Sequence, residues 1–165
     1  MFGLSISNIP GSGLGLVVDR NVTAGELLLR VPHKLLLMGE RVTGMGGTNA
    51  LALALLTEKY KGSTSQWAPY IQFLSGMDPV GTPLFFNASE RSLLRGTDVL
   101  GWSLSRESNV IRTHRYLRES GTHNVPKDLH GQDLAWALSI AWSRGFTIST
   151  SECCRIPARA SCLEP

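Results

Sequence analysis

The pattern of hydrophobic and polar positions changes character near residue 40. Before it, short apolar runs at 16–18 and 26–31 are separated by a polar turn at 21–25. Apolar runs of about four to eight residues, bounded by glycine, proline or asparagine, are typical of β-strands. The first part of the chain therefore predicts a glycine-rich turn at 11–15 that feeds a β-hairpin, with an extended segment at 35–37.

After residue 40 the apolar positions recur about every third or fourth residue, which is the period of an amphipathic helix. Thr48 or Asn49 is available as the N-cap of the first helix, which Gly62 ends, and Ser65 can cap the next. The first predicted helix is 49–60, and a second follows Ser65, with Trp67, Tyr70, Ile71 and Leu74 on its apolar face. A third begins with a capping box formed by Asn87 and Glu90. The last two are 98–120, whose main apolar positions are Leu104, Ile111 and Leu117, and 132–142.

The helix predicted at 132–142 is apolar almost all round, since Leu134, Trp136, Leu138, Ile140 and Trp142 leave it little polar surface. A helix of this kind is typically buried. The fold class that the pattern predicts is α+β, with a short β segment and mainly helical structure after it. A lone hairpin is marginal in water, so the β segment is expected to need partner strands that the later sequence does not supply.

Composition excludes several classes of protein. The chain has 165 residues, 42% hydrophobic and 18% charged, with a net charge of +3, as in an ordinary globular domain. No apolar run reaches the roughly 18 residues that span a bilayer, and no secretory signal is visible, so we expect a cytoplasmic or nuclear protein without a membrane partner. The three cysteines fall within the last thirteen residues and the histidines lack ligand spacing, so neither a disulfide framework nor a metal site is expected.

Arginines cluster in the predicted helix 98–120, at Arg106, Arg112, Arg115 and Arg118. Only Tyr116 lies among them as an aromatic residue for base stacking. We interpret them as a solvated helix face and expect no nucleic-acid partner, although binding of an acidic partner or a nucleic acid stays an alternative.

The glycine-rich segment 11–15 is the main candidate for ligand contact, because glycine lets a backbone pass close to a bound molecule. A dinucleotide site would need a strand before it and a helix after it, and a Walker loop would end in Gly-Lys-Ser/Thr. Neither requirement is met, since Leu16-Val17-Val18 favours a strand. A plain surface turn remains the alternative.

Four segments of the chain carry a resemblance to a known family. They are Ser12-Gly13-Leu14-Gly15-Leu16 with Ala24-Gly25-Glu26 and Leu29-Arg30-Val31-Pro32; Leu51 to Tyr60 with Lys61-Gly62 and Ser65 to Tyr70; Pro83-Leu84-Phe85-Phe86 with Glu90, Leu94, Gly96 and Thr97; and Trp136 to Ile140 with Trp142 to Phe146. In this order they resemble the SET-domain methyltransferases of the Rubisco large-subunit lysine methyltransferase type, over residues 10–148.

The resemblance implies a division of the chain into N-terminal SET strands at 1–40, a helical insert at 41–130, a buried helix that re-enters the SET fold at 131–148, and a divergent tail at 149–165 that is expected to be disordered. It implies S-adenosylmethionine as cofactor and a protein lysine side chain as methyl acceptor. The protein substrate is accordingly the expected partner.

The same resemblance implies roles for individual residues. Ser12, Gly13, Leu14 and Gly15 are expected to contact the cofactor. Arg144 is expected where cofactor and substrate meet, and a guanidinium suits the cofactor's carboxylate because the two can form a bidentate pair. Ile148 is a further candidate on the substrate side. A helix C-terminal cation is the alternative reading of Arg144, and a buried aliphatic residue that of Ile148.

The sequence departs from the family after Ile148. The family continues into an Asn-His pair that binds cofactor and a tyrosine near the transfer channel, and neither is found here, so no catalytic residue is assigned. We therefore expect a truncated form with little or no methyltransferase activity alone. A non-catalytic protein-interaction module derived from such an enzyme is the alternative.

Overall fold

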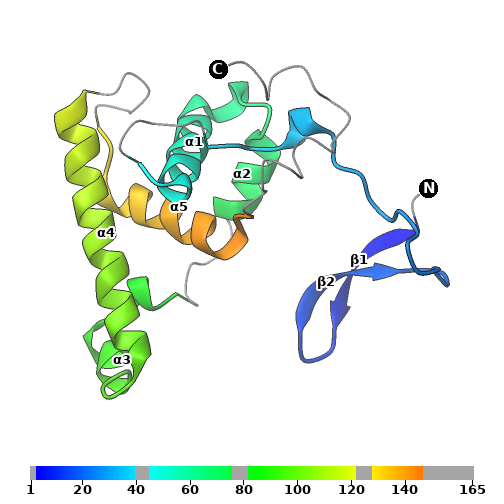
Figure 1. Cartoon of the computed structure of the whole chain (residues 1–165), viewed down its shortest axis with the longest axis horizontal. Coiled ribbons are helices and arrows are strands. Elements are labelled where there is room, and N and C mark those ends of the chain that lie inside the picture. The colour runs from blue at the N-terminus through cyan, green and yellow to red at the C-terminus, as the bar shows by residue number, and fades with distance from the viewer. Residues whose placement is uncertain (1–2, 40–44, 76–81, 122–127, 147–165) are drawn as a thin grey trace.

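The computed structural model describes residues 3–39, 45–75, 82–121 and 128–146 (Figure 1). It has the predicted α+β composition: a two-stranded antiparallel sheet precedes a body of helices. The strands are β1 (Leu4–Ile9) and β2 (Gly13–Val18), and the helices are α1 (Gly47–Lys61), α2 (Ala68–Ser75), α3 (Ala88–Leu93), α4 (Asp98–Ser120) and α5 (Gly131–Arg144). Short 3₁₀ turns occupy His33–Leu35, Gly62–Thr64 and Pro83–Phe85.

The glycine-rich segment is itself the turn of the hairpin, which corrects the prediction that it feeds a hairpin turning at 21–25. Leu4 pairs with Val18 and Ile9 pairs with Gly13 across the turn. Gly11 and Gly13 have φ of 77° and 76°, in the left-handed region that glycine enters without steric cost. Within the described part, residues 26–31 form no strand.

The segment around residues 35–37 is extended only in part, because the chain first makes a 3₁₀ turn over His33–Leu35. Pro32 precedes this turn with φ −60° and ψ 140°, and the chain is extended again at Leu36. The turn could not be predicted from the apolar run Leu35-Leu36-Leu37, because such a run does not by itself distinguish a strand from a helical turn.

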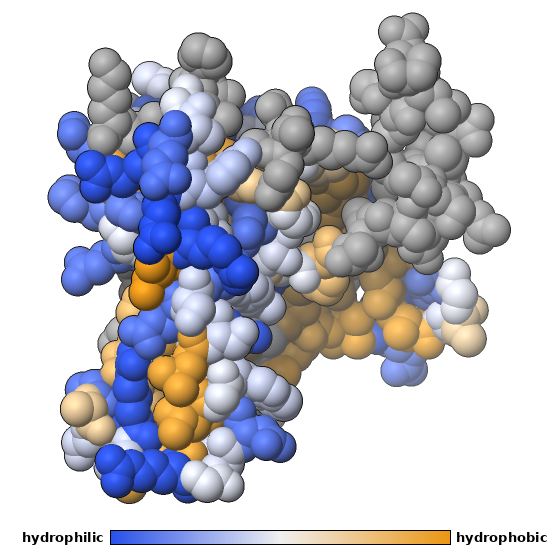
Figure 2. All heavy atoms as spheres, turned by 60° about the vertical axis from the view of Figure 1, so that its left-hand side comes forward, coloured by the Kyte–Doolittle hydropathy of each residue, from blue (hydrophilic) through white to orange (hydrophobic). Residues whose placement is uncertain are grey.

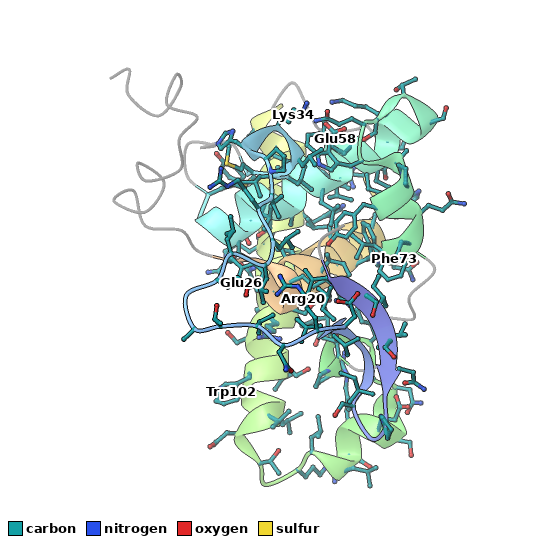
Figure 3. All side chains as sticks on the ribbon, turned by 90° about the vertical axis from the view of Figure 1, so that its right-hand side faces the viewer. Arg20, Glu26, Lys34, Glu58, Phe73 and Trp102 are labelled. Atoms are coloured by element: carbon teal, nitrogen blue, oxygen red, sulfur yellow. The ribbon has the colours of Figure 1, made fainter. Side chains whose placement is uncertain are left out.

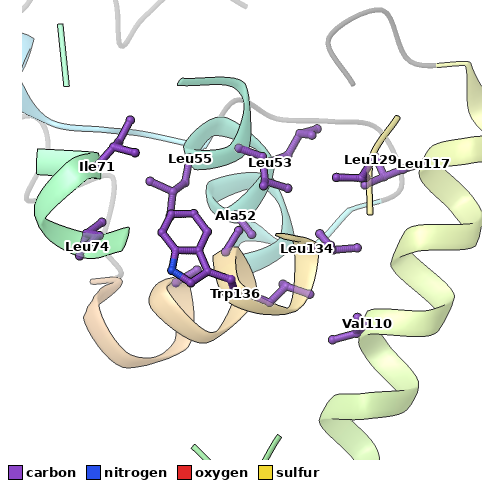
Figure 4. Packing of buried hydrophobic residues seen from close by; sticks show 14 residues of the cluster. Ala52, Leu53, Leu55, Ile71, Leu74, Val110, Leu117, Leu129, Leu134 and Trp136 are labelled. Carbon is purple, nitrogen blue, oxygen red and sulfur yellow. The ribbon is translucent and has the colours of Figure 1, made fainter. Parts of the chain in front are cut away.

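The core lies between α1 and α5, as Figure 4 shows. Leu56 and Leu134 are fully buried there, and Trp136 of α5 lies beside Leu55 and Ala52 of α1 (Figure 4). Leu74 of α2 closes one side of the cluster. The prediction of a buried helix in the region of 132–142 is therefore confirmed.

The helix ends follow the predicted residues only in part. Gly62 ends α1 with a positive φ of 56°, as expected of a glycine at a helix end. The N-cap is Gly46 rather than Thr48 or Asn49, because the helix begins at Gly47. Ser65 Oγ accepts a hydrogen bond from the Trp67 backbone N–H at 3.1 Å just before α2 begins.

Helix α4 buries a different face from the one predicted. Val110, Thr113 and Leu117 face the interior, whereas Leu104 and Ile111 are 49% and 56% exposed. The buried positions are three and four residues apart, so they form one side of the helix, and Leu104 and Ile111 fall outside it. Of the three predicted apolar contacts, only Leu117 belongs to the core.

The predicted capping box opens α3. The Glu90 backbone N–H donates to Asn87 Oδ1 at 3.0 Å, and the Asn87 backbone N–H donates to Glu90 Oε2 at 2.8 Å. We expect Asn87→Ala to lower the free energy of unfolding by about 0.5–2 kcal/mol, because it removes an N-cap acceptor. Urea denaturation followed by circular dichroism measures this loss. Ser89→Ala, two residues later, is the control, and equal stability of the two variants would contradict the prediction.

An ion pair joins the end of α1 to the start of α5. Lys59 Nζ lies 2.8 Å from Asp133 Oδ1, and the Tyr60 hydroxyl donates to Asp133 Oδ2 at 3.0 Å. Lys59 also lies over the ring of Trp136, 4.4 Å from its centre. The hydrogen bond from Lys59 lowers the pKa of Asp133 against the opposing effect of burial, with Tyr60 adding to the lowering.

This lowered pKa makes stability depend on pH. A carboxyl group whose pKa is lower in the folded than in the unfolded chain stabilises the fold above its unfolded pKa, and the contribution is lost as the pH falls through the folded pKa. We expect the free energy of unfolding to fall as the pH drops below 3.8, and to fall less steeply in Asp133→Asn. Urea titrations across this range, with Asp128→Asn as control, measure the slope. Parallel slopes for Asp133→Asn and the unmodified chain would contradict the prediction.

Candidate functional site

A cavity of about 380 Å³ lies where the segment after Pro32 meets α1, α2 and the end of α5. Its walls are mostly apolar, and the described lining residues are Leu35, Leu36, Leu37, Leu51, Leu55, Trp67, Tyr70, Ile140, Ala141, Arg144 and Gly145. Cavities of this size with a few polar groups are the usual form of small-molecule sites. This cavity is therefore the leading ligand site in the described part of the chain.

Two glycines allow tight packing near this cavity, Gly39 against the backbone of α1 and Gly145 against the last turn of α5. A Cβ on Gly39 would lie 2.4 Å from the backbone nitrogen of Leu51, and a Cβ on Gly145 would lie 2.4 Å from the carbonyl oxygen of Ala141. Leu51 also approaches that position on Gly145 to 3.1 Å. The close approach of Gly39 and Gly145 to Leu51 brings the two chain segments to the same part of α1.

Arg144 is the last residue of α5, and it carries the one formal charge among the described lining residues. Its side chain is exposed, and Nη1 donates to Ser143 Oγ at 3.2 Å. A cation at this end is favoured by the helix dipole, so the position alone does not require a ligand. The helix dipole does not explain why Arg144 lies at an apolar cavity. There its guanidinium can pair with an anionic group of a ligand while the cavity holds a hydrophobic group of the same ligand.

The other predicted cofactor residues, Ser12, Gly13, Leu14 and Gly15, lie in the hairpin turn and the start of β2. The turn is open, since nothing lies within 4 Å of a Cβ placed on Gly11 or Gly13. None of the four residues lines the cavity that contains Arg144. The structure therefore places the two halves of the predicted site in different elements without one shared cavity.

Gly15 has a packing role of its own. It lies opposite Ser7 in the sheet, and the side chain of Ile9 comes within 2.5 Å of the position that a Cβ on Gly15 would occupy. The absence of a side chain at Gly15 therefore lets Ile9 lie across the hairpin. This packing contact accounts for a glycine at position 15 whether or not a ligand approaches it.

The loop after β2 is closed by an ion pair between Arg20 and Glu26, which Figure 3 labels. The hydrogen bond from Arg20 is the main cause that lowers the pKa of Glu26 to about 2, and the Thr23 backbone N–H adds to it. Glu26 is therefore held as a carboxylate that faces a cation, which makes it a structural acceptor in this loop rather than an acid.

Other predictions from the sequence concern the residues after α5, metal binding and membrane spanning. Ile148 and the tail 149–165 lie outside the described residues. In the described ranges, no group of three histidine, cysteine, aspartate or glutamate side chains could hold a metal ion. In the same ranges no helix combines the length and apolarity needed to cross a membrane.

Sequence reasoning missed most of the cavity wall. Trp67 and Tyr70 were predicted on the apolar face of one helical segment, and the structure places both in the wall of the cavity, where Tyr70 is 43% exposed. The Trp67 indole N–H points at the carbonyl oxygen of Leu35, at 3.5 Å, which ties α2 to the segment after Pro32. The spacing of Trp67 and Tyr70 predicted that they share one face of a helical segment. No signal in the sequence showed which segment of the chain packs opposite that face.

Comparison with known proteins identifies relatives along nearly the whole chain. No protein-family profile matches it. The actin-histidine N-methyltransferases of Gallus gallus and Homo sapiens are each 31% identical over 175 aligned positions, which cover 93% of this chain and 29% of the relative. That of Drosophila melanogaster is 33% identical over 124 positions, covering 70% of this chain and 22% of the relative.

The chain thus spans less than a third of the length of the curated relatives that it matches. These relatives are named for methyl transfer to a histidine of actin, whereas the resemblance noted from the sequence implied lysine. The chain is a distant homologue of the actin-histidine N-methyltransferases, which supports the resemblance to SET-domain protein methyltransferases without singling out the Rubisco large-subunit type.

Proposed function

We propose that this chain supplies the cofactor-binding part of an S-adenosylmethionine-dependent methyltransferase that acts on a nitrogen of a protein side chain. The observation that carries the proposal is the alignment of 93% of the chain with proteins named as N-methyltransferases. The proposal extends to a cytoplasmic or nuclear location, which a protein substrate inside the cell would require.

The donor chemistry of the proposed residues fits the cofactor. S-adenosylmethionine carries an ammonium, a carboxylate, an apolar adenosine face and a methyl group that its sulfonium makes electrophilic. Arg144 would pair with the carboxylate, and the backbone of Ser12–Gly15 would bind polar groups of the cofactor, with closest access at Gly13, where no side chain blocks the approach. The apolar cavity beside Arg144 would receive a hydrophobic part of cofactor or substrate.

The hairpin and Arg144 line no shared cavity in the described structure, so the proposal requires the hairpin turn to approach the end of α5 when cofactor binds. One face of the hairpin favours such a rearrangement. Ile6 pairs with Leu16 on that face, and these side chains are 77% and 64% exposed. Burying exposed apolar surface of this kind against another part of the protein is favourable by about 25 cal/mol per Å².

The proposed methyl acceptor is a nitrogen of a protein side chain. The relatives are named for a histidine of actin, so a histidine side chain is the first acceptor to test, with lysine second. Either nitrogen would attack the methyl carbon only when it is neutral and aligned, and the bond from that carbon to sulfur would break to release S-adenosylhomocysteine. The methylated side chain then gives up one proton, from the amine nitrogen of a lysine or from the other ring nitrogen of a histidine. Arg144 and Ile148 are the residues proposed on the substrate side.

Photochemical cross-linking with S-adenosylmethionine labelled on its methyl group tests the assignment of residues. We expect label in peptides that contain residues 11–16 or the end of α5, and its loss in the presence of excess S-adenosylhomocysteine. Label confined to α3 and α4 would contradict the proposal. In the same mixture with actin added, we expect little or no methyl transfer by this chain alone.

A non-catalytic protein-interaction module is the second candidate. The exposed apolar face of the hairpin favours it, because a surface of this kind is typical of a protein contact. Cofactor binding distinguishes the two candidates, since the module has no need of it.

A further inference from the structure

The outward face of α4 combines exposed apolar side chains with arginines that form no ion pair with any residue that the structure describes. Leu104 and Ile111 are exposed on it, and Arg115 and Arg118 follow on the same side of the helix. We call these four residues the α4 ridge. In Figure 2, which turns the α4 side of the molecule toward the viewer, the lower part of this side shows a hydrophobic patch bordered by hydrophilic spheres, and mostly hydrophilic spheres lie above it.

The spacing of the ridge is that of a helix-pairing seam. Leu104, Ile111 and Arg118 are seven residues apart in succession, and Arg115 is four residues after Ile111. Positions spaced in this way form a single stripe along a helix, the arrangement that packs against a second helix. Val110 and Leu117, which face the core, lie on a different side of α4.

The charge at the carboxyl end of the ridge is positive and uncompensated within the described residues. Arg112, Arg115 and Arg118 are exposed, and none of them makes an ion pair or hydrogen bond through its side chain in that part of the chain. Glu119 is the nearby acid. Other charged residues of α4 are engaged elsewhere, since Glu107 pairs with Arg91 at 2.9 Å and Arg106 lies over the ring of Trp142 at 4.9 Å.

We propose that the α4 ridge binds an acidic amphipathic helix of a partner protein. The apolar side chains Leu104 and Ile111 would pack against the partner's apolar stripe, and its carboxylates would face Arg115 and Arg118. Complementary charge steers such partners together and selects among them. This inference does not depend on the proposed methyl transfer, because no residue of the ridge belongs to that site.

A protein helix suits the ridge better than a nucleic acid. A nucleic-acid surface combines phosphate contacts with aromatic stacking, and Tyr116 is the one aromatic residue among these arginines. The exposed leucine and isoleucine side chains, which form the amino-terminal half of the stripe, gain nothing from a phosphate backbone. They do gain from the apolar face of a helix.

Fluorescence anisotropy with the full chain tests the proposal. The probe is a labelled synthetic peptide of about 20 residues, roughly 30 Å of helix, with leucine along one stripe and glutamate elsewhere. We expect saturable binding that weakens as salt is raised, and a loss of at least about tenfold in affinity in the double variant Arg115→Glu/Arg118→Glu. Leu104→Gln/Ile111→Gln should weaken binding as well, without changing its salt dependence.

The control variant is Arg30→Glu/Arg95→Glu, which makes the same change in net charge at exposed arginines away from the ridge. It should retain most of the affinity. An equal loss in the control, unchanged binding of a peptide with lysine in place of glutamate, or preferential binding of duplex DNA would each overturn the proposal. All ridge positions are exposed, so circular dichroism should show these variants folded.

Discussion

Leu138→Ala is expected to lower the free energy of unfolding by about 2–5 kcal/mol, the range for truncating a fully buried leucine. Leu138 is fully buried in α5 and belongs to the cluster that joins this helix to α1. Removing its side chain loses the transfer free energy of the buried carbons and leaves a cavity that neighbouring side chains fill only in part. Urea denaturation followed by circular dichroism at 222 nm measures the difference.

Leu93→Ala is the matched control, because it removes the same atoms from a side chain that is 81% exposed. Its effect should stay within about 0.5 kcal/mol, as for most surface substitutions. If the two alanine variants were equally stable, Leu138 would not lie in a packed interior, and the account of α5 as a buried helix would be wrong.

Arg144→Met is expected to weaken binding of S-adenosylmethionine at least about tenfold, because a charge-assisted hydrogen bond to a carboxylate contributes about 1.5–3 kcal/mol. Methionine keeps much of the length and apolar character of the arginine stem, so the cavity wall is preserved while the guanidinium is lost. Since Arg144 is exposed, the fold should be retained. Titration of each protein with the cofactor and a melting curve of each provide the two readouts.

Arg112→Met is the control for this experiment, since it removes an exposed arginine from α4 with the same change in net charge. It should leave cofactor affinity unchanged. A similar loss in both variants would mean that Arg144 acts through the overall charge of the protein, and the proposed pairing with the cofactor's carboxylate would have to be abandoned.

The helical part of the fold could be predicted from the sequence because its signals are local. The capping box at Asn87 and Glu90, the C-terminal Gly62 of α1 and the apolar composition of α5 each act within a few residues, and the structure confirms all three. The buried face of α4 was predicted wrongly, because which stripe of a helix faces the core depends on its neighbours. Leu104 looked like a core residue in the sequence and proved to be exposed.

The hairpin and the cavity illustrate the same limit. The strand Leu4–Ile9 contains serines and an asparagine among its apolar residues, so its pairing with β2 depended on the turn geometry of Gly11 and Gly13. The cavity wall combines Leu35, Trp67 and Arg144 from segments far apart in sequence. Contacts of this kind follow from tertiary packing, which a single sequence does not encode in its local pattern.

Isothermal titration of this chain with S-adenosylmethionine tests the central claim most directly. Our account predicts a single saturable isotherm, with binding that S-adenosylhomocysteine competes away and that Arg144→Met weakens. A chain that circular dichroism shows to be folded, but that gives no heat and no change in melting temperature with the cofactor, would contradict the account.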